Sequence, residues 1–150
     1  MIRSLLLVGF AWCVVGCASA PTYTESEQSN AALLRGSRAN FFRFYGGEAF
    51  VHLAEIDGLA SGANSLRITP GKHRIGVLLM TLGNEGRDYL DLTLAPNREY
   101  SFHAQLVGLS FKLDFLDVTG CGRRVVKSFR VMSGSSPPTQ VTPIFIPVAS

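Results

Sequence analysis

The sequence predicts an all-β fold, an antiparallel β-sandwich of about seven strands. Between residues 31 and 132, short segments alternate apolar and polar side chains with the two-residue period of a half-buried strand. Turn-forming pairs such as Asp57-Gly58 and Pro70-Gly71 separate these segments at intervals of about 8 to 12 residues. No stretch of this region shows the 3.6-residue period of a convincing helix.

The chain begins with a segment typical of bacterial secretion signals. Arg3 supplies a positive charge, and Leu5 to Val15 form an apolar run of about eleven residues. As a helix rising about 1.5 Å per residue, this run would reach about 16 Å, which is half the hydrocarbon thickness of a bilayer. We therefore expect residues 1–16 to be a signal peptide rather than a membrane-spanning segment.

The end of this run, Val14-Val15-Gly16-Cys17, resembles the bacterial lipobox. In lipobox proteins the cysteine thiolate, a strong nucleophile, takes up a diacylglycerol before the signal is cut in front of it. The resemblance implies that Cys17 is lipidated and anchors the chain to a membrane. Ala18 follows instead of aspartate, which is similar to lipoproteins passed on to the outer membrane. The alternative is simple cleavage after Ala20, because the segment also offers a small-x-small site.

The elements of the mature chain follow in order. Residues 17–30 are polar and are expected to be a flexible tether. Residues 31–132 are expected to form the sandwich domain, beginning with a short strand from Ala31 to Leu34. Its further strands are AFVHLAEI, SLRI, HRIGVLLMTL, DYLDLTL, REYSFHAQL, SFKLDFL and RRVVKSFRVM. Four prolines forbid helix and central strand in residues 133–150, which we expect to be an extended tail.

The alternation also predicts which side chains are buried. In three of these strands, every second residue is apolar over at least three positions, so these residues share one face. We expect that face to lie in the core. The residues concerned are Leu90, Leu92 and Leu94, then Tyr100, Phe102, Ala104 and Leu106, and then Phe111, Leu113 and Phe115.

Several of these positions form a pattern found in a known class of domain. Ile56-Asp57-Gly58 is followed about ten residues later by Leu66, Ile68, Pro70-Gly71 and His73, and later by an aromatic strand around Tyr100. The pattern resembles the small β-domains of bacterial envelope lipoproteins related to the PEGA type. The resemblance implies a small β-domain in the cell envelope. It does not imply an activity, because these motifs are turn and core signatures and fold alone does not assign function.

Charge argues against nucleic acid as a partner. Without Arg3 the chain carries 13 basic and 11 acidic residues, a net charge of only +2. Basic residues gather at the last strand, but alternation would place Arg124 and Arg130 on one face and Arg123 and Lys127 on the other. We expect a solvated edge there rather than a single basic patch.

No catalytic or metal-binding motif stands out. Asp88 and Asp91, like Asp114 and Asp117, are three residues apart and would point to opposite faces of a strand, which does not suit the two-carboxylate chemistry of glycoside hydrolysis. The histidines lack metal-ligand spacing, and we expect His73 to be half-buried and hydrogen-bonded. We therefore expect no cofactor, no metal and no enzymatic activity.

Two segments are candidates for contact with a partner. In FFRFY, the side chains of Phe41, Arg43 and Tyr45 would share one face, although the strand could instead be buried on both sides. The second is the loop LGNEGR, with Asn84 and Arg87. We expect a lipid-anchored envelope protein that serves as a non-enzymatic binding or assembly module, with an envelope protein or polysaccharide as its partner. The alternative is a small envelope hydrolase whose site is not visible in the sequence.

Overall fold

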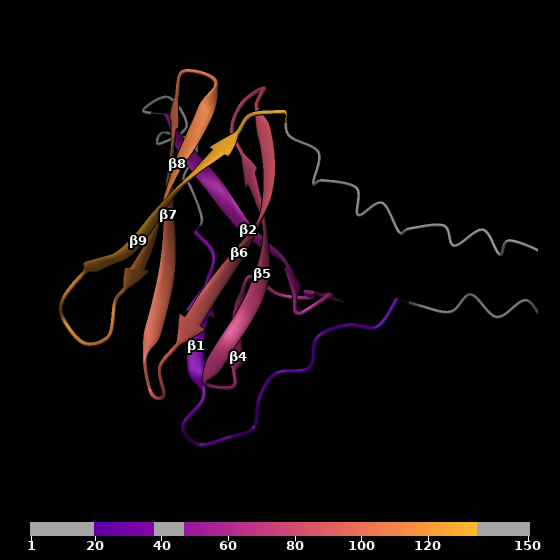
Figure 1. Cartoon of the computed structure of the whole chain (residues 1–150), viewed down its shortest axis with the longest axis vertical. Helices are drawn as coiled ribbons and strands as arrows, with labels where there is room; N and C mark the ends of the chain where they lie inside the picture. The colour runs from indigo at the N-terminus through magenta and orange to yellow at the C-terminus, as the bar shows by residue number, and fades with distance from the viewer. Residues whose placement is uncertain (1–19, 38–46, 135–150) are drawn as a thin grey trace, which may run out of the picture.

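The computed structural model describes residues 20–37 and 47–134 (Figure 1). They form nine strands and no helix, so the predicted all-β class is confirmed, with nine strands instead of seven. No helix in this part of the chain has the length and apolar character needed to cross a bilayer. The strands are β1 (Ala32–Arg35), β2 (Glu48–Ile56), β3 (Leu59–Ala60), β4 (Ser65–Ile68), β5 (Gly71–Met80), β6 (Glu85–Leu94), β7 (Glu99–Val107), β8 (Ser110–Asp117) and β9 (Arg124–Met132).

The strands form one sheet that folds into two layers, a sandwich-like arrangement. Neighbours along the order β4-β1-β7-β2-β5-β6 are hydrogen-bonded, and β8 and β9 extend the sheet beyond β7. Strand β2 takes part in both layers, because Glu48 and Ala49 pair with β7 whereas the rest of the strand pairs with β5. Figure 1 shows β7, β8 and β9 on one side of the molecule and β5 and β6 on the other.

The prediction of a purely antiparallel sandwich is wrong for β1. Leu33 to Arg35 pair in parallel with Glu99 to Ser101 of β7, while the opposite edge of β1 pairs antiparallel with β4. The two partners β1 and β7 are far apart along the chain. Local patterns of turns and alternation reveal hairpins but not such a distant pairing.

The core lies between the layers, where alternation predicted it. The predicted core residues of β6 and β8 are 4% exposed or less, and Tyr100, Phe102 and Ala104 of β7 are also buried, whereas Leu106 is partly buried. The Tyr100 ring stacks on Phe115, with the ring centroids 4.9 Å apart. Burial of each such large side chain contributes about 1.5 to 3 kcal/mol. The alternating face of each strand therefore supplies the packing that holds the sandwich together.

The end of β9 joins the two layers. Strand β9 pairs antiparallel with β8, and in Figure 1 its C-terminal end points toward β5 and β6. The amide of Gly134 donates to the Glu85 carbonyl at 2.6 Å, next to the start of β6. Gly86 permits this approach, because a Cβ there would lie 3.0 Å from both the Met132 carbonyl oxygen and the Phe111 ring. A glycine at this position thus lets β9 cover the core.

Residues 20–30 lie against the sandwich. The Tyr23 amide donates to the Ala60 carbonyl and the Ser26 amide to the Arg67 carbonyl, both at 2.9 Å, and Tyr23 packs on the core. The flexible tether over residues 17–30 stays a prediction, but residues 20–30 do bond to backbone groups that β3 and β4 leave open. Cys17, with the rest of residues 1–19, lies outside the described residues. So does the tail after Gly134.

Candidate functional site

The residues predicted for partner contact fall into two groups. Phe41, Arg43 and Tyr45 lie outside the described residues. Asn84 is in the turn between β5 and β6, where its Oδ1 accepts a hydrogen bond from the Ser133 hydroxyl at 3.1 Å. Arg87 is exposed, and its Nε donates to Glu85 at 3.0 Å. Asn84 thus ties the hairpin to the end of β9, and a contact role for either residue stays a prediction.

His73 occupies the structural position that the sequence predicts. Its Nε2 donates to the Thr69 carbonyl at 2.7 Å, and its Nδ1 lies 2.7 Å from Oδ2 of Asp57. The side chain is only 9% exposed. Burial raises the pKa of Asp57, but hydrogen bonds from His73 and from the Arg74 amide outweigh this and leave it below the ordinary value. Both ring nitrogens are engaged, so His73 braces two turns instead of facing a ligand.

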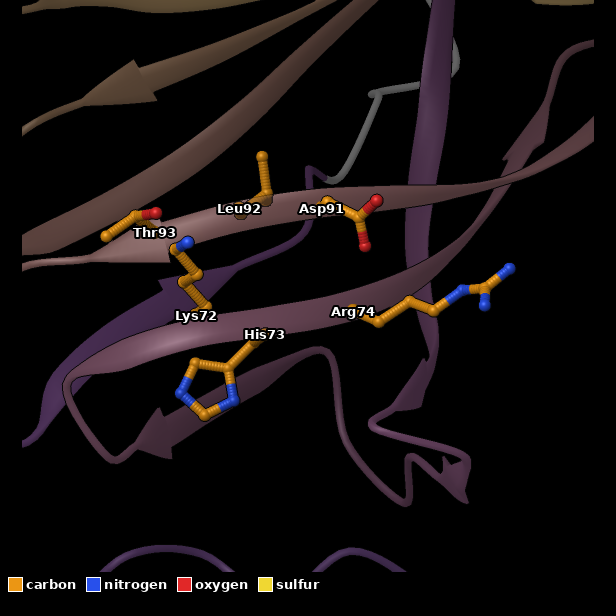
Figure 2. A pocket seen from close by; sticks show the side chains of 6 residues that line it. All are labelled: Lys72, His73, Arg74, Asp91, Leu92 and Thr93. Carbon is orange, nitrogen blue, oxygen red and sulfur yellow. The ribbon is translucent and has the colours of Figure 1, made fainter.

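A hollow of about 500 Å³ lies over β5 and β6 beside His73 (Figure 2). Figure 2 shows Lys72 pointing toward Thr93 on the neighbouring strand, while the His73 ring points to the other side of β5. Lys72, Arg74, Asp91 and Thr93 are all exposed, so water reaches their polar groups, and the buried His73 ring already has both nitrogens engaged. An exposed, mixed-charge surface of this kind does not hold a ligand away from solvent.

A polar row crosses the outer face of β7, β8 and β9. The Ser128 hydroxyl donates to Asp114 Oδ1 at 2.6 Å, and Lys112 Nζ lies 3.3 Å from Oδ2 of the same carboxylate. His103 is the cross-strand partner of Asp114 and lies 3.8 Å from a Glu48 oxygen. The row therefore contains the residue types of a serine hydrolase, and its bonding decides whether it could act as one.

The bonding in this row does not suit a nucleophile. An activated serine donates its proton to a histidine base, whereas Ser128 donates to a carboxylate. Burial raises the pKa of Asp114, but hydrogen bonds from Ser128 and Lys112 outweigh it and hold the pKa below its usual value. A carboxylate with a lowered pKa is a weak base near neutral pH. The row is better explained as a set of outer-face polar side chains that satisfy one another's hydrogen bonds.

The two aspartates of β8 belong to separate clusters. Asp114 bonds to Ser128 and Lys112, whereas Asp117 is bound at the end of β8 by a turn and two arginines. They do not form the carboxylate pair that glycoside hydrolysis requires. Within residues 20–37 and 47–134, no group of three or more His, Cys, Asp or Glu side chains is placed to hold a metal ion.

The second cluster surrounds a hollow of about 240 Å³ beside the loop between β8 and β9, which we call the arginine hollow. Asp117 lies at its base, 8% exposed, and Oδ1 accepts a hydrogen bond from the Thr119 amide at 3.0 Å. Hydrogen bonding by Thr119, with the charges of two arginines, lowers the pKa of Asp117. The lining residues are Arg98, Asp117, Thr119, Gly122, Arg123 and Arg124.

The arginine hollow corrects one expectation about β9. Arg124 was predicted to share a face with Arg130, but Arg124 pairs with Asp117 and Arg130 with Lys112, on opposite faces. The cause is a β-bulge, because Phe115 pairs with Lys127 and Leu116 with Val125, which leaves Val126 as an extra residue. One extra residue reverses the facing of all positions beyond it.

Sequence reasoning also missed Arg98. This residue lies in the turn between β6 and β7, and its Nη1 is 3.7 Å from Asp117 Oδ2. Its place beside the β8–β9 loop depends on the pairing of β7 with β8 across the whole length of both strands. A register of this kind carries no signal around Arg98 itself.

The chain matches no protein family model, no curated protein and no solved structure. The functional argument therefore depends on the residues of this chain.

Proposed function

We propose that this chain is a lipid-anchored protein of the bacterial cell envelope, at the outer membrane, whose β-sandwich is a non-enzymatic binding or assembly module. The observation that carries the proposal is the lipobox-like Val14-Val15-Gly16-Cys17 directly after a charged and apolar signal segment. The resemblance of the domain to PEGA-type β-domains implies the same location and adds to the argument.

The attachment of residues 21–30 to the sandwich agrees with an anchoring role. The Pro21 carbonyl accepts a hydrogen bond from the Ala60 amide at 3.3 Å. Pro21 is four residue steps beyond Cys17, and an extended chain spans at most about 3.5 Å per step. A lipidated Cys17 would therefore hold β3 within about 14 Å of the lipid surface. Such a short connection suits a module that works next to a membrane.

Binding is favoured over catalysis by the state of the carboxylates. The three aspartates with perturbed pKa values, Asp57, Asp114 and Asp117, are all shifted downward, and each accepts hydrogen bonds from neighbouring residues. General-base catalysis near neutral pH needs the opposite shift, toward the working pH. Among the described residues, these groups therefore have the character of structural ion pairs. A small envelope hydrolase is the alternative class.

Metabolic labelling tests the anchor. Cells that express the full chain are fed radiolabelled palmitate, and we expect label on the wild-type protein and on Cys121→Ser, but none on Cys17→Ser. Cys121 is exposed and is the matched control for a thiol outside the lipobox. Equal labelling of Cys17→Ser and wild type, or an unlabelled wild-type band, would overturn the proposal.

A second experiment tests the binding role. In-cell crosslinking of the labelled protein, followed by extraction, should capture a defined envelope component. Turnover of an envelope polymer by the purified protein, lost in Asp114→Asn, would instead support the hydrolase alternative.

A further inference from the structure

The arginine hollow carries more positive charge than its own residues neutralise. Arg98, Arg123 and Arg124 line it, and Asp117 is the one carboxylate among the described residues that do so. The nearby Glu99 side chain is paired with Arg35 at 3.4 Å, on the outer face of β7. Three guanidinium groups against one carboxylate leave the hollow with two uncompensated positive charges.

The guanidinium groups converge because one buried oxygen holds two of them. Arg98 Nη1 and Arg124 Nη2 lie 3.7 Å and 3.5 Å from the same atom, Oδ2 of Asp117. The arginine side chains are 49% and 78% exposed, whereas that of Asp117 is 9% exposed. Each guanidinium has five N–H donors, so most of them face solvent and are open to a ligand.

The β8–β9 loop, which carries Arg123 and leads into Arg124 at the start of β9, is fixed to β7 at its first residues. The Glu99 amide donates to the Thr119 hydroxyl at 2.9 Å, and the Val118 amide donates to the Glu99 carbonyl at 2.8 Å. These bonds position the start of the loop before any ligand arrives. A positioned site costs less ordering entropy on binding than a mobile one.

We propose that the arginine hollow binds a phosphate group. A phosphate monoester carries a charge of about −1.5 to −2 near pH 7, which balances the excess of the hollow. Guanidinium forks bind two oxygens of such a group at once. The hollow has a volume of about 240 Å³. In liquid water about eight molecules occupy that volume, so the hollow has room for a phosphate and for part of the molecule that carries it.

The position of the hollow selects the source of the phosphate. Figure 1 shows the loop between β8 and β9 at the left edge of the domain and the N-terminal start of the described chain on the right. If Cys17 holds the chain to a membrane, the β8–β9 loop that borders the hollow lies on the far side of the domain from the anchored end. We therefore assign the phosphate to a soluble or polymeric envelope component instead of a headgroup of the anchoring bilayer. This assignment rests on the proposed function, whereas the phosphate site does not.

A titration with inorganic phosphate tests the site. The full chain is purified in a nonionic detergent, and amide shifts of residues 117–124 are followed by NMR. We expect saturable changes for wild type, with affinity lower by about tenfold or more in Arg123→Gln and Arg124→Gln because each removes charge-assisted hydrogen bonds. Arg130→Gln removes the same charge from the opposite face of β9 and should bind as wild type does. All three side chains are exposed, so thermal unfolding should confirm that the variants fold.

The outcomes separate the site from its source. Absence of saturable shifts, or an equal loss of affinity in Arg130→Gln, would overturn the phosphate site. A second arm uses protein that remains anchored in membrane fragments. It compares the recruitment of vesicles of phosphatidylcholine with phosphatidic acid and of vesicles of phosphatidylcholine alone. Recruitment of phosphatidic acid vesicles that depended on Arg124, alongside saturable binding of free phosphate, would overturn the assigned source. Loss of palmitate label in wild type would overturn the anchor and leave the phosphate titration unaffected.

Discussion

The carboxylate of Asp57 lies 2.7 Å from the Nδ1 atom of His73 and joins the β2–β3 turn to the start of β5. Asp57 has a φ of 51° and Gly58 a φ of 84°, the geometry of a two-residue type I′ hairpin turn. The turn aims Oδ1 at the Arg74 amide, 2.8 Å away, and Oδ2 at His73. One turn residue therefore positions both a backbone donor and a buried ring.

Replacement of Asp57 by asparagine should destabilise the protein. The asparagine side chain keeps one oxygen as an acceptor. Its NH₂ group replaces the second carboxylate oxygen and cannot accept a hydrogen bond. We expect the free energy of unfolding to fall by about 1 kcal/mol. This is the low end of the cost of an unsatisfied hydrogen-bonding group, because the Asp57 side chain is 44% exposed. Urea unfolding at pH 7 measures this. Asp91→Asn, an exposed position on β6, should stay within about 0.5 kcal/mol, and an equal effect of the two would contradict the bracing role.

The pH dependence of the same variant follows from the lowered pKa of Asp57. A carboxylate whose pKa is lower in the folded state contributes stability above its unfolded pKa of about 3.9 and loses it as the pH falls through the folded value. The difference between wild type and Asp57→Asn should therefore be present above about pH 4 and shrink as the pH falls below it. A difference that grew on acidification would have the wrong sign.

Removal of the Ser128 hydroxyl should raise the pKa of Asp114. Hydrogen bonding from Ser128 offsets the burial of this carboxylate, so Ser128→Ala leaves burial less opposed. A ¹³C NMR titration of the Asp114 carboxyl measures the change. Ser110→Ala is the control, since its hydroxyl bonds to the Val107 carbonyl. An unchanged titration of Asp114 in Ser128→Ala would show that the short hydrogen bond does not exist in solution.

Replacement of Gly36 by alanine should be among the most damaging small changes. A methyl group there would overlap the carbonyl oxygen of Val51 and the side-chain oxygen of Asn64, which accepts a hydrogen bond from Leu53. We expect a loss of about 3 kcal/mol or more, because backbone must move. Gly122→Ala, where the added methyl would meet open space, should be nearly neutral. Similar unfolding midpoints for both variants would refute the close packing of Gly36 against Val51 and Asn64.

Hydrogen exchange tests the attachment of residues 20–30. The amides of Tyr23 and Ser26 donate to backbone carbonyls of β3 and β4, so they should exchange more slowly than the amide of Glu25. Mass spectrometry with residue-level fragmentation can compare them. Uniformly fast exchange over the segment would restore the flexible tether that its polar composition predicts.

The sequence could predict the strands and their buried faces because both follow from local patterns. The alternation around Phe102 and Phe111 indicates the core face directly, and the Asp57-Gly58 pair indicates a hairpin. Other features depend on distant pairing or on one residue of register. The parallel contact of β1 with β7, the bulge at Val126 and the approach of Arg98 to Asp117 have no local signal. The polar composition of residues 20–30 indicates side chains in contact with water. It does not exclude hydrogen bonds from the backbone of this segment to an open strand edge.

Intact mass and N-terminal fragmentation of the protein extracted from membranes test the anchoring proposal most directly. The account predicts a chain that starts at Cys17, with the added mass of a diacylglycerol on sulfur, and loss of that species in Cys17→Ser. An unmodified chain that begins at Pro21, as cleavage after Ala20 would produce, would contradict it.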